Sequence, residues 1–175
     1  MTIKTIFLDR DGVINKEVNY LYKIEEFEFI NGTFDACLYF LKLGYKIIII
    51  SNQSGISRGY YTEKDYQKLT QWMISQFNKN GIEILDTLHC PHSPEFNCNC
   101  RKPKPGMFNV AISRYSIDFE ASWMIGDKET DITAANLAGI SNTILVRSGH
   151  KIEESKSNAM FFLNSIHEST KVIQG

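Results

Sequence analysis

Two carboxylates stand two residues apart in the segment Asp9-Arg10-Asp11-Gly12, directly after the short apolar run 6–8. Charges this close repel each other unless a cation lies between them. Magnesium prefers oxygen ligands and commonly combines one or two carboxylates with phosphate oxygens of a substrate. The pair therefore indicates a magnesium site for phosphate chemistry. A solvated turn is the alternative, because Asp and Gly are common turn residues.

Polar residues also follow the next three predicted strands. These residues are Ser51-Asn52-Gln53 after the run 45–50, Cys90 after 84–88, and Gly126-Asp127 after 122–125. The carboxyl ends of parallel strands meet at one edge of a sheet, which is where ligands bind in open α/β folds. Four polar segments that converge there favour a catalytic site over a turn, and Asp127 would complete the magnesium ligands.

The pattern of elements predicts an α/β chain in which strands alternate with helices. Strands are expected at 6–8, 45–50, 84–88, 122–125 and 143–146, with a sixth at 160–163, and helices at 34–41, 63–77, 105–116 and 130–138. Thr62 starts the second helix, while Gly44 and Gly139 stop the first and last. Such alternation implies a Rossmann-like three-layer fold with a parallel sheet covered on both faces.

Four soft or borderline ligands lie within eleven residues, namely Cys90, His92, Cys98 and Cys100. Their composition is typical of a closed tetrahedral zinc site, although Cys-x-His and Cys-x-Cys are less common pairs than Cys-x2-Cys. Buried free cysteines or a disulfide are the alternative. Zinc with four protein ligands has no open position, so this loop at about 90–100 is expected to be structural and to position the residues that follow it.

Composition limits the remaining possibilities. The 175 residues are 43% hydrophobic, which predicts one domain over 1–175. A net charge of -1 argues against a broad basic surface for nucleic acid or anionic lipid. The N-terminal apolar run is too short for a signal peptide or a membrane span. We expect a cytoplasmic protein, monomeric as far as the sequence requires, with a small-molecule substrate.

The motifs Asp9-x-Asp11, Ser51, Lys102 and Gly126-Asp127 together resemble the haloacid dehalogenase superfamily of phosphatases. The resemblance implies that Asp9 attacks phosphorus to form an aspartyl-phosphate, and that Asp11 acts as general acid and base. It further implies that Ser51 and Lys102 stabilise the transferring phosphoryl group.

The same resemblance implies that magnesium is bound by Asp9, Asp127 and the backbone carbonyl of Asp11. Asp131 is expected to cap a helix or to support the metal site indirectly. The gaps between the motifs are too short for a cap domain, so the site should be open and selectivity should reside in loops.

The zinc segment narrows the resemblance to D-glycero-D-manno-heptose 1,7-bisphosphate 7-phosphatases, with histidinol-phosphate phosphatases as the alternative. It rests on the segments 9–12, 51–59, 90–92 and 98–107. This likeness implies removal of the C7 phosphate on the route to nucleotide-activated heptose and bacterial surface polysaccharide. A catalytically silent, zinc-stabilised binding domain is the rival from another class.

Substrate contacts are expected from residues around these motifs. Arg101 and Lys102 supply two neighbouring cations, which suits a substrate with two phosphates. The full set of expected substrate-binding residues is Arg10, Glu17, Val18, Asn19, Tyr20, Asn52, Gln53, Ser54, Arg101 and Lys128. Lys104 is expected to face solvent, His89 to be structural, and His150 and His167 to lie at the surface.

Overall fold

A computed structural model describes residues 2–174 of the chain, and its centre is one sheet of six parallel strands. The strands are β1 Thr5–Leu8, β2 Lys46–Asn52, β3 Asp86–Cys90, β4 Trp123–Gly126, β5 Asn142–Val146 and β6 Phe161–Leu163. They lie in the order β3-β2-β1-β4-β5-β6, the strand order of a Rossmann-like sheet. The predicted fold class is confirmed.

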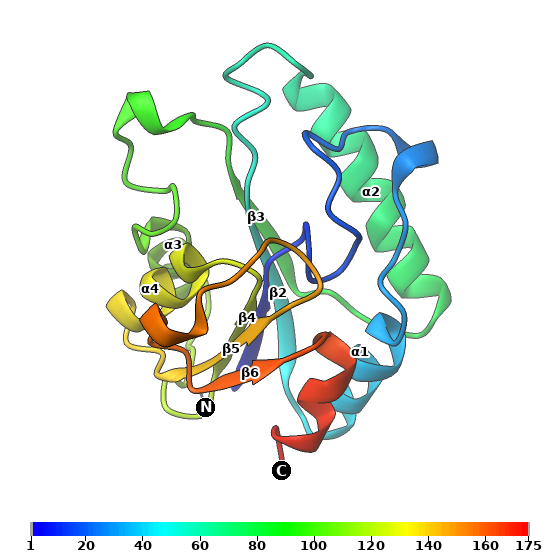
Figure 1. Cartoon of the computed structure of the whole chain (residues 1–175). Helices are drawn as coiled ribbons and strands as arrows, with labels where there is room; N and C mark the ends of the chain where they lie inside the picture. The colour runs from blue at the N-terminus through cyan, green and yellow to red at the C-terminus, as the bar shows by residue number, and fades with distance from the viewer. Residues whose placement is uncertain (1, 175) are drawn as a thin grey trace.

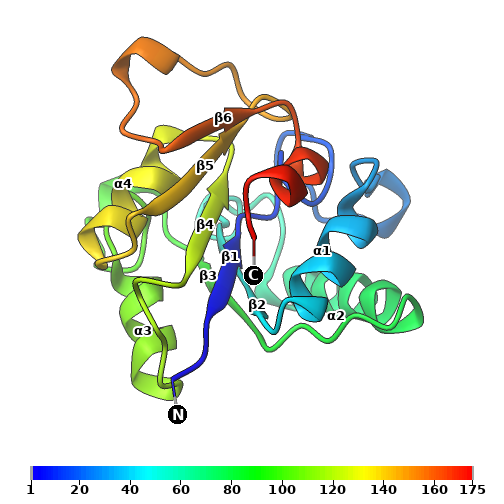
Figure 2. The same ribbon diagram turned by 90° about the horizontal axis from the view of Figure 1, so that it is seen from below.

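Helices cover both faces of this sheet and produce three layers (Figures 1 and 2). One face carries α1 Thr33–Lys42 and α2 Glu63–Lys79, together with the C-terminal 3-10 helix Ile166–Lys171. The other face carries α3 Gly106–Arg114 and α4 Glu129–Leu137. Two hydrophobic cores result, one on each side of the sheet.

Strand β2 shows why the sheet is buried on both faces. Successive side chains of a strand point to opposite faces. Ile47 and Ile49 accordingly pack into the core under α1 and α2, whereas Ile48 and Ile50 pack into the core under α3. All four side chains are at most 2% exposed. A continuous β-branched run therefore predicts a central parallel strand correctly.

Helix α2 begins where its sequence predicts. The Thr62 hydroxyl accepts a hydrogen bond from the Asp65 N–H, and the Asp65 carboxylate accepts one from the Thr62 N–H. This reciprocal pair satisfies two of the four N–H groups that a helix start leaves without partners.

The third strand, in contrast, was placed wrongly, because β3 covers 86–90 and not 84–88.

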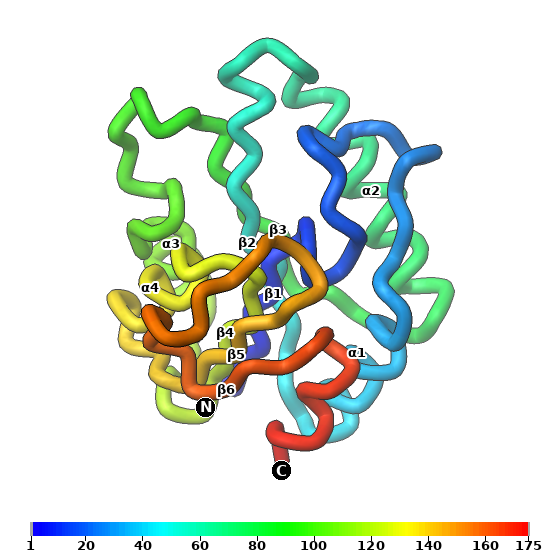
Figure 3. The backbone as a smooth tube through the Cα atoms, in the orientation of Figure 1, coloured from blue at the N-terminus to red at the C-terminus, as the bar shows by residue number. Residues whose placement is uncertain are grey.

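Three loops rise above the carboxyl ends of the strands and surround one edge of the sheet (Figure 3). They follow β1, β2 and β3, and they cover residues 9–32, 53–62 and 91–105. Within residues 2–174 these connections hold only short 3-10 turns, so no cap domain is inserted there. In the same part of the chain, no helix is both long and apolar enough to cross a membrane.

Candidate active site and thiol cluster

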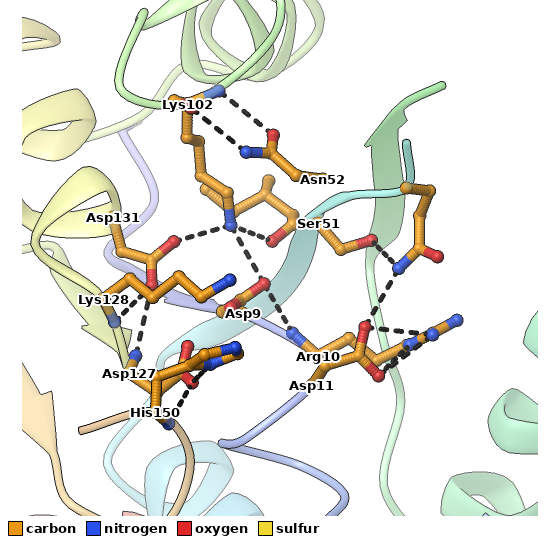
Figure 4. Close-up of polar contacts among 12 residues, drawn as sticks. Asp9, Arg10, Asp11, Ser51, Asn52, Lys102, Asp127, Lys128, Asp131 and His150 are labelled. Carbon is orange, nitrogen blue, oxygen red and sulfur yellow. Dashed lines mark hydrogen bonds and ion pairs between the residues drawn. The ribbon is translucent and has the colours of Figure 1, made fainter. Parts of the chain in front are cut away.

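A cavity of about 360 Å³ opens among the three loops at the carboxyl edge of the sheet. Asp9 and Asp11 reach it from the end of β1, Lys102 from the loop after β3, and Asp131 from the first turn of α4. The predicted convergence of distant segments is thus found in the structure. Figure 4 shows the side chains of Asp9, Lys102 and Asp131 pointing toward one another.

Lys102 is the centre of the polar contacts. Its ammonium group lies 2.9 Å from Asp9 Oδ1, 2.7 Å from Asp131 Oδ1 and 2.9 Å from the carbonyl oxygen of Ile50. An ammonium group has three N–H donors, so all of them are used. The side chain is 3% exposed. Its position is therefore set by three separate elements.

The Lys102 backbone is held just as firmly. Asn52 Oδ1 accepts a hydrogen bond from the Lys102 N–H at 3.1 Å, and Asn52 Nδ2 donates to the Lys102 carbonyl at 3.1 Å. Asn52 also lines the cavity. Both of its polar groups are nevertheless occupied by backbone, so it acts first as a clamp that places the lysine.

Asp127 lies beside Asp9 and Asp131, fully buried. One oxygen from each of the three carboxylates lies within 4.8 Å of the others, a grouping that can hold a cation. We call these three residues with Lys102 the carboxylate centre. Asp127 Oδ1 has no hydrogen-bond partner among the described residues. A buried carboxylate oxygen without a partner is costly, and the residues therefore fit a divalent cation.

Asp131 has the capping position that the sequence predicts. Its Oδ2 accepts hydrogen bonds from the N–H groups of Asp127 and Lys128, both at 3.1 Å, at the start of α4. Its other oxygen pairs with Lys102. One side chain therefore caps a helix and neutralises part of the lysine charge.

Asp11 is turned away from the other carboxylates. Its side chain forms an ion pair with Arg10 and accepts hydrogen bonds from Asn15 Nδ2 at 3.0 Å and Gln53 Nε2 at 3.2 Å. Gln53 in turn accepts a hydrogen bond from the Tyr61 hydroxyl and donates one to Ser51 Oγ at 3.2 Å. The Asp11 carboxylate is thus held by a network that spans β1 and β2.

Burial and charge together shift the pKa values at the carboxylate centre. Burial raises the pKa of Asp9 well above its ordinary value, and the charge of Asp131 adds to this effect while Lys102 opposes it. For Lys102, burial favours the neutral form, but the carboxylates of Asp131 and Asp9 outweigh it and raise the pKa. Each ion therefore needs the other, and a cation beside Asp9 would favour its charged form.

The sulfur and imidazole ligands also come together, in what we call the thiol cluster (Cys90, His92, Cys98 and Cys100). Contacts of Cys100 Sγ measure 3.0 Å to Cys90 Sγ, 3.5 Å to Cys98 Sγ and 3.3 Å to His92 Nδ1. All four cysteines of the chain are free thiols in the structure. A tetrahedral Zn–S₃N site has ligand atoms about 3.5–3.8 Å apart, so the group is close to the geometry that zinc would take.

This cluster contacts the loop after β2 through the backbone. The Gln53 N–H donates to the Cys90 carbonyl at 2.7 Å, and the Ser57 N–H donates to the Pro91 carbonyl at 3.1 Å. The Ser57 hydroxyl accepts a hydrogen bond from the Ser93 N–H at 2.8 Å. Folding of the thiol cluster therefore determines the shape of one cavity wall.

Comparisons with known proteins identify relatives that cover nearly the whole chain. Residues 99–169 match a family model described as HAD-hyrolase-like. The chain is 48% identical to D-glycero-alpha-D-manno-heptose-1,7-bisphosphate 7-phosphatase of Photorhabdus laumondii, with 98% of this chain and 97% of that protein covered. It is 41% identical to the beta-anomer enzyme of Pasteurella multocida, with the same coverage of 98% and 97%.

The chain belongs to the heptose 1,7-bisphosphate 7-phosphatase family. A solved structure of a family member from B. bronchiseptica, complexed with magnesium and phosphate, superposes with a TM-score of 0.84. It is 26% identical, and the match covers 97% of each chain. Membership in this family of HAD-like phosphatases agrees with the resemblance carried by the motifs.

Most of the residues that are expected to bind substrate in this chain line the cavity. They are Glu17, Val18, Asn19, Tyr20, Asn52, Gln53, Ser54, Arg101 and Lys128. Arg10 lies elsewhere, because its side chain is 2% exposed and its Nη2 donates to the carbonyl of Leu21 beneath the loop. The guanidinium is drawn inward by the Asp11 carboxylate and does not line the cavity. Ser51 is likewise 1% exposed and lies below the cavity surface.

Two residues expected at the surface are partly exposed and also make contacts that were not expected. Lys104 Nζ donates to Asn97 Oδ1 and to the Cys98 carbonyl, both at 2.8 Å, so it braces the loop that carries the thiol cluster. His150 lines the cavity, and its Nδ1 lies 2.6 Å from Asp127 Oδ2. The signal for His150 was available, since it follows β5 at the same sheet edge that the other motifs share. His167 is exposed, as expected. His89, which was expected to be structural, pairs with Glu63 and stacks on Tyr66.

Proposed function

We propose that the chain hydrolyses the C7 phosphate of D-glycero-D-manno-heptose 1,7-bisphosphate through an aspartyl-phosphate on Asp9. The observation that carries this proposal is the pairing of Asp9 with the buried Lys102 at the floor of a polar cavity, in a chain whose relatives bear the name of that reaction. The pathway served would be nucleotide-activated heptose synthesis, in the cytoplasm.

In the first step a carboxylate oxygen of Asp9 attacks phosphorus, and the bond between phosphorus and the sugar oxygen breaks. Asp11 gives its proton to that leaving oxygen. In the second step water attacks the aspartyl-phosphate, Asp11 takes the proton from water, and Asp9 is released with inorganic phosphate. Lys102 and the Ser51 hydroxyl stabilise the charge on the phosphoryl oxygens.

Magnesium would be held by Asp9, Asp127 and the backbone carbonyl of Asp11. The unpartnered Oδ1 of Asp127 supports this assignment. The Asp11 carboxylate bonds to Arg10, Asn15 and Gln53 and does not face Asp9 and Asp127, so the backbone carbonyl is the Asp11 group proposed for the metal. Bound magnesium would neutralise phosphate charge and allow an anionic nucleophile to approach an anionic substrate. Lys102 contributes a second positive charge beside Asp9.

The substrate's second phosphate would meet the cations at the cavity rim. Arg101 and Lys128 both line the cavity, and Arg101 is anchored by a hydrogen bond from its Nη1 to the His92 carbonyl at 3.2 Å. Zinc in the thiol cluster would thereby fix Arg101 and, two residues after Cys100, Lys102. Its role would be structural, because four protein ligands leave no position for substrate.

Release of inorganic phosphate by the purified protein tests this proposal. The substrates are the alpha and beta anomers of the heptose bisphosphate and histidinol phosphate, each with magnesium and with EDTA. Relatives named for both anomers align across the chain, so both belong in the assay. We expect rapid, magnesium-dependent release from a heptose bisphosphate, with heptose 1-phosphate as the product in ³¹P NMR.

Two outcomes would contradict the proposal. Faster hydrolysis of histidinol phosphate would assign the enzyme to histidine synthesis. No release from any of the three substrates, with magnesium bound and the fold intact, would favour a catalytically silent binding domain. We expect neither result, because each position that the chemistry requires is filled.

A further inference from the structure

The imidazole of His150 lies beside Asp127 of the carboxylate centre (Figure 4). On one side its Nδ1 lies 2.6 Å from Asp127 Oδ2. On the other its Nε2 lies 3.8 Å from Glu17 Oε1. The sequence alone predicted a surface position for this residue, and the chemistry proposed above makes no use of it.

His150 determines how the Asp127 carboxylate is turned. Oδ2 of Asp127 accepts two hydrogen bonds from this one residue, from the backbone N–H at 2.9 Å and from Nδ1 at 2.6 Å. Since a carboxylate can only accept, Nδ1 must carry the hydrogen. With Oδ2 occupied in this way, the unpartnered Oδ1 is the oxygen left to face Asp9 and Asp131.

The backbone packs closely against Asp127. A Cβ atom on Gly149 would lie 2.1 Å from Asp127 Oδ2, and one on Gly12 would lie 2.3 Å from the same oxygen. Oδ2 is therefore in close contact with two glycines as well as with the imidazole.

The second ring nitrogen of His150 faces Glu17, which lines the cavity. Glu17 begins the segment 17–20, which lines the cavity after the first motif. Within residues 2–174 we find no other ion pair for Glu17. The imidazole therefore brings a polar group of the wall formed after β5 to within 3.8 Å of this segment.

A role for His150 as a zinc ligand does not fit its position. It is absent from the thiol cluster, whose four ligands are complete without it. A role as an ordinary surface residue does not fit either, because its ring is fixed by a 2.6 Å contact to a fully buried carboxylate. Metal-binding side chains are commonly oriented by such outer partners, which tune how tightly the metal is held.

We propose that His150 is a positioning residue with two functions, one for each ring nitrogen. Nδ1 orients Asp127 so that Oδ1 faces the cation, and Nε2 holds Glu17 so that the segment 17–20 meets the sugar. Only the role of Nε2 at Glu17 rests on the proposed function. The role of Nδ1 at Asp127 does not, because cation binding by Asp127 can be measured without a substrate.

The first half is tested by the rise in melting temperature that magnesium produces in the substrate-free protein. His150→Ala should raise the magnesium concentration needed for half of that rise by about 10-fold, the usual size of an outer-shell effect. His150→Asn should stay close to the wild type, because its amide nitrogen replaces Nδ1 as a donor. His167→Ala, which removes an exposed histidine elsewhere, is the matched control and should have no effect.

The second half is tested by steady-state kinetics on the heptose bisphosphate at saturating magnesium. His150→Asn and Glu17→Gln should both raise KM several-fold with little change in kcat, because both weaken the contact to the segment 17–20. A purely structural role would instead lower the melting temperature and leave KM unchanged.

Two results would overturn the inference. An unchanged magnesium half-point in His150→Ala would remove the role at Asp127, and an unchanged KM in both His150→Asn and Glu17→Gln would remove the role at Glu17. If the wild type hydrolyses none of the sugar phosphates, the proposed function fails, while the magnesium titration still decides the first half.

Discussion

The carboxylate centre and the thiol cluster differ in how the chain assembles them. The carboxylate centre draws one residue each from the ends of β1 and β4, from the loop after β3 and from α4, across more than a hundred residues of sequence. The thiol cluster takes all four ligands from residues 90–100. One arrangement depends on the whole sheet, whereas the other depends on one loop.

Their surroundings differ as well. The carboxylate centre borders the cavity through Asp9, Lys102 and Asp131, and Asp127 keeps an oxygen without a partner. No ligand of the thiol cluster lines the cavity, and its members contact one another. The first group is therefore open to a ligand in the cavity, whereas the second is surrounded by protein contacts.

The largest effect should come from Asp9→Asn, which removes the nucleophile and leaves the volume of the side chain unchanged. We expect kcat for phosphate release to fall on the order of 10⁴-fold, as is usual when a covalent catalyst is removed. The far-ultraviolet circular dichroism should remain that of the wild type.

Asp35→Asn is the matched control, since Asp35 is exposed in the first turn of α1. It should leave kcat unchanged. Substantial phosphate release by Asp9→Asn would mean that the carboxylate centre is not the site of covalent chemistry.

Lys102→Met should be the most destabilising change at the carboxylate centre. It leaves the buried carboxylates of Asp9 and Asp131 without their partner, and breaking a buried pair in this way costs about 3–5 kcal/mol. Urea denaturation without magnesium should show that loss in the free energy of unfolding. Added magnesium should restore part of it, because a cation beside Asp9 replaces part of the missing charge. A variant as stable as the wild type would show that the pair is not needed for folding.

Cys98→Ser should separate the two regions. We expect zinc content, measured by elemental analysis, to fall from about one equivalent, and the melting temperature to fall with it. Residual activity should show a raised KM with a smaller change in kcat, because the loop that places Arg101 is loosened while Asp9 is untouched.

Cys37→Ala is the matched control for this change, since Cys37 is a buried thiol in the core and not near the cluster. It should lower stability and retain zinc. If Cys98→Ser kept its zinc, or lost kcat as completely as Asp9→Asn, the division between the regions would fail.

The smallest effect is expected from Lys104→Met. Its contacts to Asn97 and to the Cys98 carbonyl are partly exposed to solvent, and such contacts stabilise a fold by less than about 1 kcal/mol. The melting temperature should fall slightly, and removal of zinc by a chelator should become faster. An unchanged chelation rate would show that the cluster does not rely on this brace.

The fold was predictable from sequence where burial and local chemistry agree. The β-branched run of β2 identifies a buried strand from its residue types alone. The Thr62–Asp65 capping box identifies the start of α2, because its two hydrogen bonds join residues three apart in the sequence. Strand β3 was misplaced by two residues. Pairing with β2 sets its register, in which Ile48 lies opposite Asp86 and Asn52 opposite Cys90, and this long-range pairing overrides the apolar residues at 84 and 85.

The candidate site was predictable where a residue directly follows a strand. Asp9 and Asp127 lie at the sheet edge for that reason. Arg10 and His150 were misjudged, since the direction of a side chain depends on its partners, and those partners lie on other elements. The contact of His150 to Asp127 spans 23 residues and carries no spacing signal of its own.

The two glycines beside Asp127 have a consequence for how the enzyme tolerates mutation. Each brings bare backbone so near to Asp127 Oδ2 that any side chain there would overlap it, and Gly12 also has a positive φ of 84° that other residues rarely adopt. In a screen of random variants for lost activity with retained expression, Gly12 and Gly149 should be recovered beside the reacting carboxylates. Inactive variants at these two glycines should be recovered about as often as inactive variants at Asp9, although neither glycine has an atom that takes part in the reaction.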